Sequence, residues 1–492
     1  MTSEEPGDSS VVRRDRFSGG PARGFLSSLA ADERIFAADL AVDRAHVVML
    51  AERGIVEDEV AGEILAALDD VEAAGHAALP GGEDIHEAVE SAVIERVGTE
   101  GGKMHTARSR NDEVAACIRY RLREDVLDAA EATLALREAL IGAAEEHVGT
   151  VMPGYTHLQP AQPTTVAHYL LSYEAAVRRD TARLLDAYGR INQSPLGAAA
   201  FAGTPFDVNR ERTAELLGFD GVLGNSMDAS SARDFLAETL SALATHAVTL
   251  SGLAEDLVLF ANRGHVELSD DYSSTSSIMP QKKNPDTLEL VRACAGDAVG
   301  DLAGLLTTLK GLPRAYNRDL QRAHRHAFDA ADLVAEATEV AAGAVATATW
   351  NEEALAEAAG EGFSTATGVA DLLAMAGMPF RTAHEIVAEA APDVDLGDDP
   401  ASAVATLDAA AERVVGEPVS AFVTRDAVES ALDPGESVES RDSAGGPAAP
   451  AVADQLDDAE TTADADAAAL AARRDAIVEA DDRLTAEVQR YV

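Results

Sequence analysis

Apolar residues recur at three- and four-residue intervals along most of this 492-residue chain, and this is the spacing of one face of an α-helix. The first helical segment runs from Phe25 to Gly54, and a second fits residues 56–74. A third opens at Asp84, where an acidic first turn complements the helix dipole. No stretch of useful length alternates apolar and polar residues as a half-buried strand does, so the pattern predicts an all-α protein.

Two longer segments carry heptad-like apolar series, at residues 122–143 and 240–261. Alternating three- and four-residue spacing over several turns is typical of long helices that pack nearly parallel. A third segment follows residue 286 and places Gly296, Gly300 and Gly304 four residues apart, which lets a neighbouring helix come close. The middle of the chain is therefore predicted to be a bundle of long helices.

The length of the chain favours about three domains. We expect a disordered N-terminus over residues 1–14, an N-terminal helical domain with binding segments over 15–107, a central long-helix bundle with the catalytic loops over 108–360, and a small helical C-terminal domain over 361–492. The acidic tail of this last domain, from Ala451 onward, is predicted to be a solvated helix.

A formal net charge of −47, from 86 acidic and 39 basic residues, describes an acidic surface. Such a surface argues against nucleic acid and anionic membranes as partners. Scarce lysine and abundant alanine indicate adaptation to a salt-rich cytoplasm. No apolar run approaches the ~20 residues of a membrane span, and the N-terminus lacks a signal pattern, so we expect a cytoplasmic protein.

Half of the four lysines of the chain, Lys282 and Lys283, lie in one polar loop over residues 273–286. Asn284 suits a helix N-cap and Pro285 suits the first helical position, so the loop is predicted to end at the start of a helix. Ammonium groups, hydroxyls and free backbone N–H groups at a helix N-terminus can bind an anion. We favour an anion site over the alternative, a mobile serine-rich linker.

A second cationic group occupies residues 101–112, where Lys103, Arg108, Arg110 and Asn111 stand close together. Guanidinium and amide groups are suited to recognising carboxylate or phosphate. Ion pairing with the many carboxylates nearby is an equal alternative.

Two further polar interruptions lie between the long helices. In residues 152–163, three prolines hold Thr156 and His157 in a rigid turn, which makes this histidine an acid–base candidate. In residues 225–234, Arg233 stands just inside a helix start. These segments bring hydroxyls, cations and an imidazole to the ends of the bundle helices.

The remaining histidine and cysteine positions give no cofactor pattern. His86 is interpreted as a surface residue of its helix, and Cys117 and Cys294 as small buried hydrophobes without metal or redox spacing. The chain has no phosphate-binding glycine loop after a strand. Cofactor-free chemistry on a multiply charged anion fits these parts, and a β-elimination fits well because it requires a base and donors that hold a dianion.

The loop over residues 276–286 resembles the hallmark loop of the fumarase/aspartase superfamily. Residues 105–112, 153–159, 225–234 and 310–321 are similar, in the same order, to segments of the argininosuccinate lyase family within it. The resemblance covers the chain from about residue 16 to residue 450.

This resemblance implies a carbon–nitrogen lyase that splits argininosuccinate into arginine and fumarate in arginine biosynthesis, with no cofactor and no metal. It also implies a homotetramer whose central helices form a twenty-helix bundle, with each active site shared between three subunits. Two alternatives remain: another fumarate-releasing lyase, such as adenylosuccinate lyase or aspartase, and a non-catalytic, crystallin-like protein on the same fold.

Carried over by position, the resemblance makes Ser276 the general base, while Lys282 and Asn284 hold the aci-carboxylate. His157 would orient and polarise the substrate, and Glu289 would support His157. The implied substrate-binding residues are Ser28, Asp32, His86, Arg108, Ser109, Asn111, Thr156, Arg233, Tyr316 and Gln321.

Four positions depart from the family pattern. Thr275 and Ala107 stand where the family has glycine, which should stiffen both loops. His324 replaces a lysine, and Leu26 replaces an asparagine. These departures concern loop mobility and substrate contacts.

The charge predicts a requirement for salt. At about 1 M salt the Debye length is about 3 Å, which relieves the self-repulsion of so acidic a surface. We therefore expect activity and the midpoint of thermal unfolding to fall after dialysis into dilute buffer and to return with salt. Full activity in dilute buffer would contradict the prediction.

Overall fold

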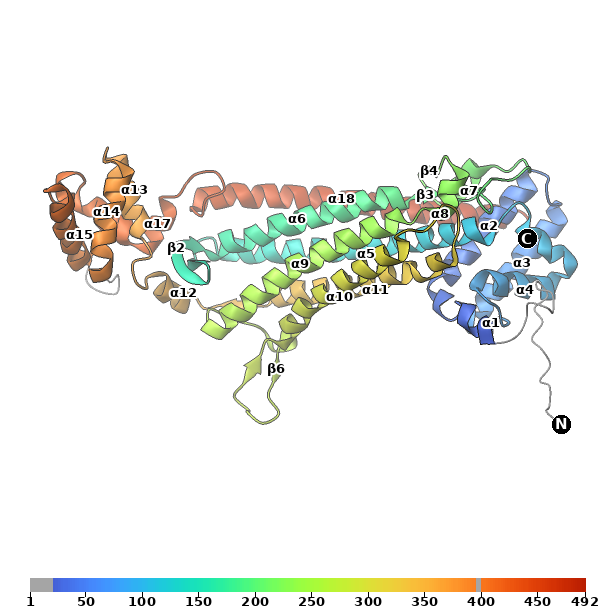
Figure 1. Ribbon diagram of the computed structural model, residues 1–492, viewed down its shortest axis with the longest axis horizontal. Helices are drawn as coiled ribbons and strands as arrows, with labels where there is room; N and C mark the ends of the chain where they lie inside the picture. The colour runs from blue at the N-terminus through green and yellow to red at the C-terminus, as the bar shows by residue number, and fades with distance from the viewer. Residues whose placement is uncertain (1–20, 395–399) are drawn as a thin grey trace.

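The computed structural model describes residues 21–394 and 400–492, and it is an elongated molecule built from long helices (Figure 1). The N-terminal helices gather at one end, the bundle forms the middle, and a small group of helices lies at the other end. The segment predicted to be disordered, residues 1–14, lies outside the described residues. The all-α prediction is confirmed.

The bundle confirms the predicted long helices. It contains α5 (Arg110–Glu146), α6 (Val166–Ile191), α9 (Asp234–Arg263), α10 (Asp286–Leu309) and α11 (His324–Ala346), which run side by side (Figure 1). In α9 the predicted heptad series is buried along the bundle axis. Burial of such a stripe is the main source of stability for helices of this length.

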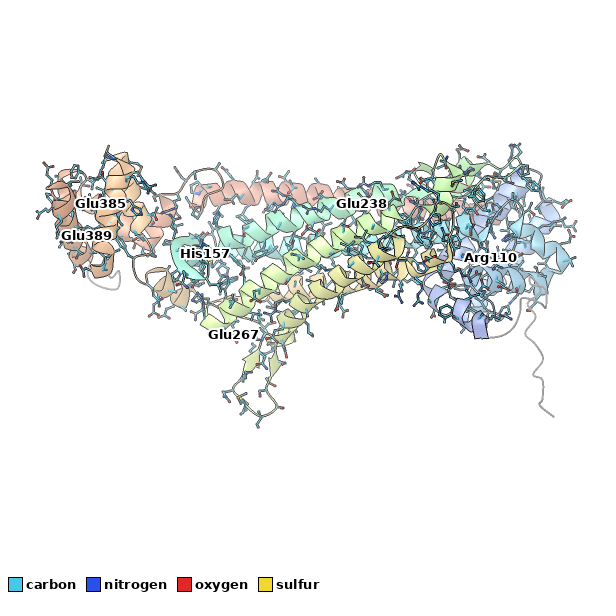
Figure 2. The ribbon with its side chains drawn as sticks, in the orientation of Figure 1. Arg110, His157, Glu238, Glu267, Glu385 and Glu389 are labelled. Atoms are coloured by element: carbon cyan, nitrogen blue, oxygen red, sulfur yellow. The ribbon has the colours of Figure 1, made fainter. Side chains whose placement is uncertain are left out.

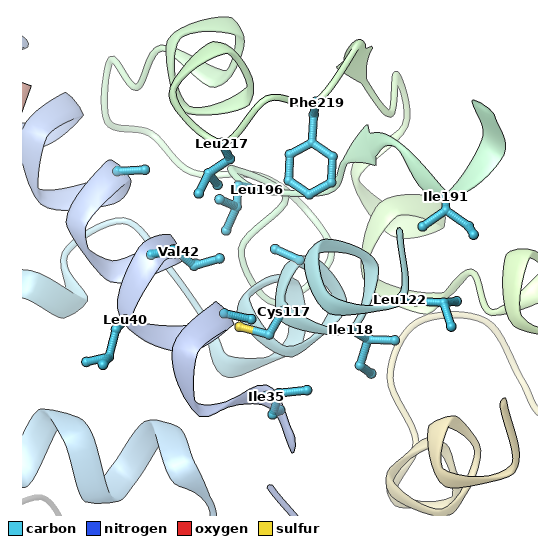
Figure 3. Packing of buried hydrophobic residues seen from close by; sticks show 14 of the residues in the cluster. Ile35, Leu40, Val42, Cys117, Ile118, Leu122, Ile191, Leu196, Leu217 and Phe219 are labelled. Atoms are coloured by element: carbon cyan, nitrogen blue, oxygen red, sulfur yellow. The ribbon is translucent and has the colours of Figure 1, made fainter. Parts of the chain in front are cut away.

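The N-terminal end packs short helices around the start of α5. They are α1 (Pro21–Leu26), η2 (Ala31–Ile35), α2 (Phe36–Glu52), α3 (Asp58–Ala74), η3 (His76–Ala78), α4 (Ile85–Val97), η4 (Thr99–His105), α7 (Arg210–Leu216) and α8 (Ser226–Ser231). Figure 3 shows the apolar core here, where Leu40 of α2 and Ile118 of α5 belong to one cluster with Leu217. Cys117 lies in this core as predicted, whereas Cys294 is only half-buried.

The far end of the molecule holds a small domain, and three further helices lie along the bundle (Figure 1). After α12 (Glu352–Ala359), the small domain contains α13 (Ala366–Met375), α14 (Phe380–Ala390), η7 (Ala391–Asp393), α15 (Pro400–Val415), η8 (Val419–Ala421), α16 (Arg425–Leu432) and α17 (Pro434–Glu439). Along the bundle, η5 (Asp270–Tyr272) and η6 (Arg318–Arg322) contact α10, and α18 (Ala449–Val488) contacts α5 and α6. The small end domain has its own apolar core around Leu373 and Leu407.

The prediction of a solvated acidic tail is wrong. Helix α18 returns along the bundle against α5 and α6 (Figure 1), and its inner face buries Val452, Leu470 and Leu484. Its outer face carries the acidic residues. Alanine at many inner positions gives this face little apolar signal in the sequence, so the acidic side dominated the pattern.

Short strands occur where the sequence predicted only turns. Strands β1 (Val151–Thr156) and β2 (Gln159–Thr165) form an antiparallel hairpin, and so do β6 (Ser274–Thr275) and β7 (Lys283–Asn284). The other strands pair β3 (Gln193–Ser194) with β4 (Gly221–Val222) and β5 (Val266–Glu267) with β8 (Thr349–Trp350). The hairpin of β6 and β7 projects from the side of the bundle (Figure 1).

The outer face of α10 exposes the apolar residues Leu290, Val299 and Leu306. Helix α9 exposes Val248 together with the polar residues Ser241, Thr245 and Glu255. Among the described residues, α9 is long and apolar enough to cross a membrane by length and composition, but half of its most apolar window is already buried inside the bundle. A core helix of a bundle passes the same test.

The four departures from the family pattern have distinct structural consequences. Ala107 has φ +63°, a left-handed conformation that costs an L-residue about 1–2 kcal/mol. Thr275 lies in β6, paired with Lys283, where any residue is accommodated. Leu26 contributes its backbone carbonyl, which accepts hydrogen bonds from Arg318 and Gln321. His324 is buried at the start of α11.

Candidate functional site

A cavity of about 260 Å³ lies where the N-terminal helices meet the bundle. Its walls come from the segment after α1, from α4, from the first turns of α5 and α9, and from η6 with the start of α11. Seven of the predicted substrate-binding residues line it: Ser28, Asp32, His86, Asn111, Arg233, Tyr316 and Gln321. Segments far apart in the sequence thus form one polar chamber.

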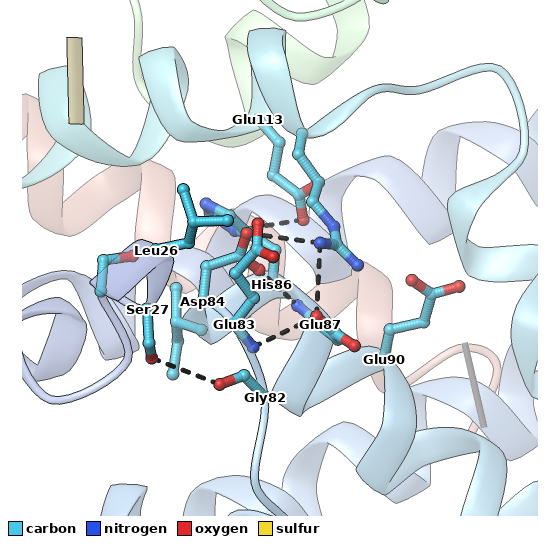
Figure 4. A network of polar contacts seen from close by, with 12 residues as sticks. Leu26, Ser27, Gly82, Glu83, Asp84, His86, Glu87, Glu90 and Glu113 are labelled. Carbon is cyan, nitrogen blue, oxygen red and sulfur yellow. Dashed lines mark hydrogen bonds and ion pairs between the residues drawn. The ribbon is translucent and has the colours of Figure 1, made fainter. Parts of the chain in front are cut away.

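His86 is not the surface residue that the sequence suggested. It is buried in the cavity wall, and its Nδ1 lies 2.6 Å from Asp39 and 3.5 Å from Glu113. Burial alone lowers the pKa of His86, but the two carboxylates outweigh burial and raise it well above its ordinary value. Figure 4 shows His86 and Glu113 within this network of polar contacts. A protonated imidazole therefore faces the cavity.

Arg108 continues the same buried network. Its guanidinium pairs with Asp43 and, at 3.0 Å, with Glu113. These pairs make ion pairing the better interpretation of its motif, and Arg108 is absent from the cavity lining. Within this chain Arg108 therefore lies in the ion network behind His86, and its role as a substrate contact stays a prediction.

The neighbours of Arg108 in the motif also make ion pairs and hydrogen bonds within the chain. Lys103 pairs with Glu57 and Glu100 at the surface, and Arg110 lies 3.3 Å from Asp84. Ser109, predicted to bind substrate, caps α5 by a capping box. Asn111 faces the cavity, and its side-chain amide donates to the carbonyl of Ala200 at 3.1 Å.

Arg233 provides the strongest anion-binding feature. Its guanidinium is buried, donates to the Ala232 carbonyl at 2.8 Å, and has no ion-pair partner among the residues that the structure describes. Burial lowers its pKa to about 10, so it remains charged at neutral pH. An unpaired buried charge is costly, so an anion entering the cavity would remove that cost.

The opposite charge is available in the same cavity. The Asp32 carboxylate accepts a hydrogen bond from the Ser28 hydroxyl at 2.7 Å and another from the Ile85 backbone at 3.1 Å. Burial raises the pKa of Asp32, against the lowering effect of the nearby His86. The chamber therefore presents an acid on one wall and the unpaired Arg233 on another.

The predicted catalytic loop lies elsewhere in the chain. Ser276 follows β6, and its hydroxyl oxygen accepts from the backbone N–H groups of Ile278 and Met279 at 3.3 and 3.1 Å. Lys283 pairs with Glu267 and Asp270. Lys282 has no ion-pair partner within the described part of the chain and is exposed.

The helix start after this loop is shifted from its prediction. Asn284 lies in β7, and Pro285 occupies the N-cap position of α10. The side chain of Ser274 instead ties the loop to Asp286. Asn284 and Lys282 share a surface hollow with Glu289 of α10.

The third group of predicted residues lies at the tip of the β1–β2 hairpin. Thr156 and His157 are exposed there, and His157 has φ +58°. In Figure 2, His157 and Arg110 of the cavity wall lie toward opposite ends of the molecule. One chain thus holds the predicted site residues in separate places.

Sequence inspection missed the carboxylates behind His86. Asp39 and Asp43 stand four residues apart in the mainly apolar helix α2, and both are buried. Acidic residues at helical spacing inside an apolar segment are the signal that could have identified them, because buried carboxylates need partners.

The same carboxylates are the described groups best placed to hold a metal ion. Asp39, Asp43 and Glu113 offer oxygen atoms within 4.8 Å of one another. His86 and Arg108 already place positive charge against all three. The arrangement is therefore best described as a buried ion network.

Known proteins are similar to this chain along nearly its whole length. A family model described as Lyase matches residues 25–300, and one described as Argininosuccinate lyase C-terminal matches residues 363–439. The argininosuccinate lyase of Haloarcula marismortui is 70% identical over 99% of this chain and 97% of its own length. That of Methanosarcina acetivorans is 45% identical over 98% of this chain and 99% of its own length.

Solved structures are also similar to this chain. EDDS lyase in complex with formate has a TM-score of 0.84 at 35% identity and covers 96% of each chain. Class II fumarase from Schistosoma mansoni has a TM-score of 0.68 at 15% identity, covering 82% of this chain and 90% of its own. The second likeness concerns the fold alone.

The buried network predicts a stability contrast between two cations of one motif. Arg108→Ala leaves Asp43 and Glu113 buried without their partner, so we expect a loss of about 3–5 kcal/mol in the free energy of unfolding. Lys103→Ala, the matched control at the surface, should leave it unchanged. Denaturant unfolding in molar salt measures both, and equal effects would contradict the assignment.

Proposed function

The chain belongs to the argininosuccinate lyase family of the fumarase/aspartase superfamily, and on that basis we propose how its residues act. The reaction is the elimination that splits argininosuccinate into arginine and fumarate. The observation that carries the proposal is the cavity that presents the buried, unpaired guanidinium of Arg233 on one wall and the Asp32 carboxylate on another. The relatives from haloarchaea place the chain in a salt-adapted lineage.

The cavity binds the charged ends of the substrate. Arg233 and the protonated His86 attract a carboxylate, while Asp32, oriented by Ser28, accepts hydrogen bonds from an ammonium group. Argininosuccinate carries both kinds of group. Asn111, Tyr316 and Gln321 supply neutral hydrogen-bonding groups that fix its orientation.

Ser276 acts as the base. It removes the proton from the carbon beside a succinate carboxylate, and the electron pair moves into that carboxylate, whose dianion Lys282 and Asn284 stabilise. When the electrons return, the carbon–carbon double bond of fumarate forms, the carbon–nitrogen bond breaks and the leaving nitrogen takes a proton. Closure of the loop, with exclusion of water, lowers the cost of using a serine as base.

The site is completed by other copies of the chain. The cavity, the Ser276 loop and the His157 hairpin are separate within one chain (Figures 1 and 2). The apolar residues exposed on α10 are suited to contact between subunits, since Gly296 and Gly300 of the same helix leave room for a neighbouring helix. We propose a homotetramer with a twenty-helix bundle, in which three subunits contribute to each site.

Within that assembly, His157 and Thr156 orient the substrate, and Glu289 supports His157. This part of the proposal rests on the exposure of these residues, at the tip of the β1–β2 hairpin and in the first turn of α10, where a second chain can reach them. The enzyme acts in the cytoplasm, in arginine biosynthesis.

An absorbance assay for released fumarate tests the function. We expect fumarate from argininosuccinate and none from adenylosuccinate or aspartate. Release from either of those two compounds alone would favour another fumarate-releasing lyase, and release from none would favour a non-catalytic protein on this fold.

Ser276→Ala should reduce turnover by orders of magnitude and leave substrate binding and the oligomer intact, because the side chain is small and exposed enough to remove without repacking. Steady-state kinetics and light scattering check both outcomes. Near-normal turnover would move the base role to another residue, with His157 the next candidate.

The paired lysines supply a matched control for this loop. Lys282→Met should greatly reduce kcat, because its ammonium is available to the dianion, whereas Lys283→Met removes an ammonium already paired with Glu267 and Asp270. Equal losses of kcat would contradict the separate roles.

A further inference from the structure

We propose that Tyr155 and Arg263 are positioning residues for the reaction, because together they hold the tip of the β1–β2 hairpin so that His157 keeps one orientation toward the substrate. The inference rests on the proposed function, since it takes His157 to orient argininosuccinate within the assembly. Both residues act through the backbone of the hairpin rather than by touching the substrate.

The tip of the hairpin is a turn of two residues in an unfavourable conformation. Thr156 pairs with Gln159, so His157 and Leu158 form the whole loop between the strands. Their φ angles are +58° and +61°, the left-handed values of a type I′ turn, in which Asn-Gly is a favoured pair. Within the described part of the chain they are the only two neighbouring residues with positive φ. Such a conformation persists only where the surrounding contacts enforce it.

The backbone of the hairpin gives this turn little support. Pro153, Pro160 and Pro163 have no N–H group, so three positions of the hairpin cannot donate a hydrogen bond to the opposite strand. The pairing is also interrupted by a bulge opposite Gly154, where a side chain would clash with the carbonyl oxygen of Gln162. Since a two-stranded hairpin is marginally stable even with a complete ladder, contacts with other elements must hold it.

Tyr155 stands next to the turn and ties it to the bundle. The guanidinium carbon of Arg263 lies 4.2 Å from the centre of the Tyr155 ring, and the centre of the Phe260 ring lies 6.3 Å from it. Phe260 and Arg263 are three residues apart at the end of α9. Phe260 is buried and packs edge-on against Trp350, so this end of α9 is a fixed support. Figure 2 shows His157 near this end of the bundle.

Arg263 makes no other polar contact with the described residues. Although the chain carries 86 acidic residues, the exposed guanidinium of Arg263 forms neither an ion pair nor a hydrogen bond within the described ranges. The face of a tyrosine ring attracts a guanidinium, and the positive charge suits the C-terminal end of a helix. One exposed contact of this kind adds little to the stability of a large bundle, so its main effect is local, on the tip of the hairpin.

The side chain of His157 depends on the turn for its direction. Its imidazole is exposed and makes no hydrogen bond to another residue that the structure describes, so within one chain the backbone determines where it points. The Tyr155 hydroxyl has no partner among those residues either, in contrast to Tyr173, whose hydroxyl donates to Asp256 at 2.7 Å. Tyr155 therefore supports the turn through its ring and not through its hydroxyl.

Kinetics on the intact oligomer in molar salt give the first test. Tyr155→Leu and Arg263→Gln should each lower kcat for argininosuccinate by about three- to tenfold with a much smaller change in KM, because the cavity still binds the substrate while His157 is misoriented. Tyr155→Phe and Arg263→Lys keep the ring and the cation and should retain most of kcat. The double variant should lose no more than Tyr155→Leu alone, since both side chains act through one contact. Arg413→Gln, which removes an exposed arginine paired with Glu389 in the small domain, is the control for lost charge and should follow the wild type.

Amide hydrogen exchange gives a second test that requires no turnover. In peptides that contain residues 154–160, exchange should be several-fold faster in Tyr155→Leu and Arg263→Gln than in the wild type and in Arg413→Gln, while peptides from α5 and α6 keep their wild-type rates. Wild-type exchange at the tip in both variants, or equal losses of kcat in Tyr155→Phe and Tyr155→Leu, would overturn the proposal. Failure of the wild type to cleave argininosuccinate would instead contradict the proposed function, while the exchange rates would still test the support of the tip.

Discussion

A buried network of charges across three helices is the interaction on which the rest of the site depends. Asp39 and Asp43 of α2, His86 of α4, Glu113 of α5 and Arg108, which precedes α5, balance one another's charge in a buried position. Such groups tolerate burial only when they are paired. The network therefore holds the three helices in one arrangement, keeps His86 protonated and gives the cavity its positive wall. Arg233 adds a buried guanidinium whose counter-charge is left to the ligand.

The sequence predicted the helices better than the contacts between residues that lie far apart in the chain. The helical spacing of residues 240–261 and 122–143 was sufficient to identify α9 and α5, because each helix buries one stripe of its own sequence. His86 was assigned to the surface because its partner Asp39 lies 47 residues away, and no local pattern records that contact. The short hairpins were missed since glycine, proline and polar residues hide their pairing.

The sequence predicted which residues the candidate cavity would contain, but it did not predict how the site residues are arranged in space. Resemblance to a family identified seven residues that meet in one cavity. It could not show that Arg108 pairs with Asp43 and Glu113, because the sequence gives no distance between them. Nor could it separate Lys282 from Lys283 by contact, whereas the structure pairs only the latter among the described residues. In both cases the information lies in ion pairs between distant residues, which only the structure shows.

In the proposed assembly the cavity and the Ser276 loop of one active site come from different subunits. Co-expression of Ser276→Ala and Arg233→Met chains with different tags, followed by purification through both tags, tests it most directly. Each variant alone should be inactive, while random mixing should restore about a quarter of the wild-type sites, because some sites then combine an intact loop with an intact cavity. Mixed oligomers that form but remain inactive would contradict the claim.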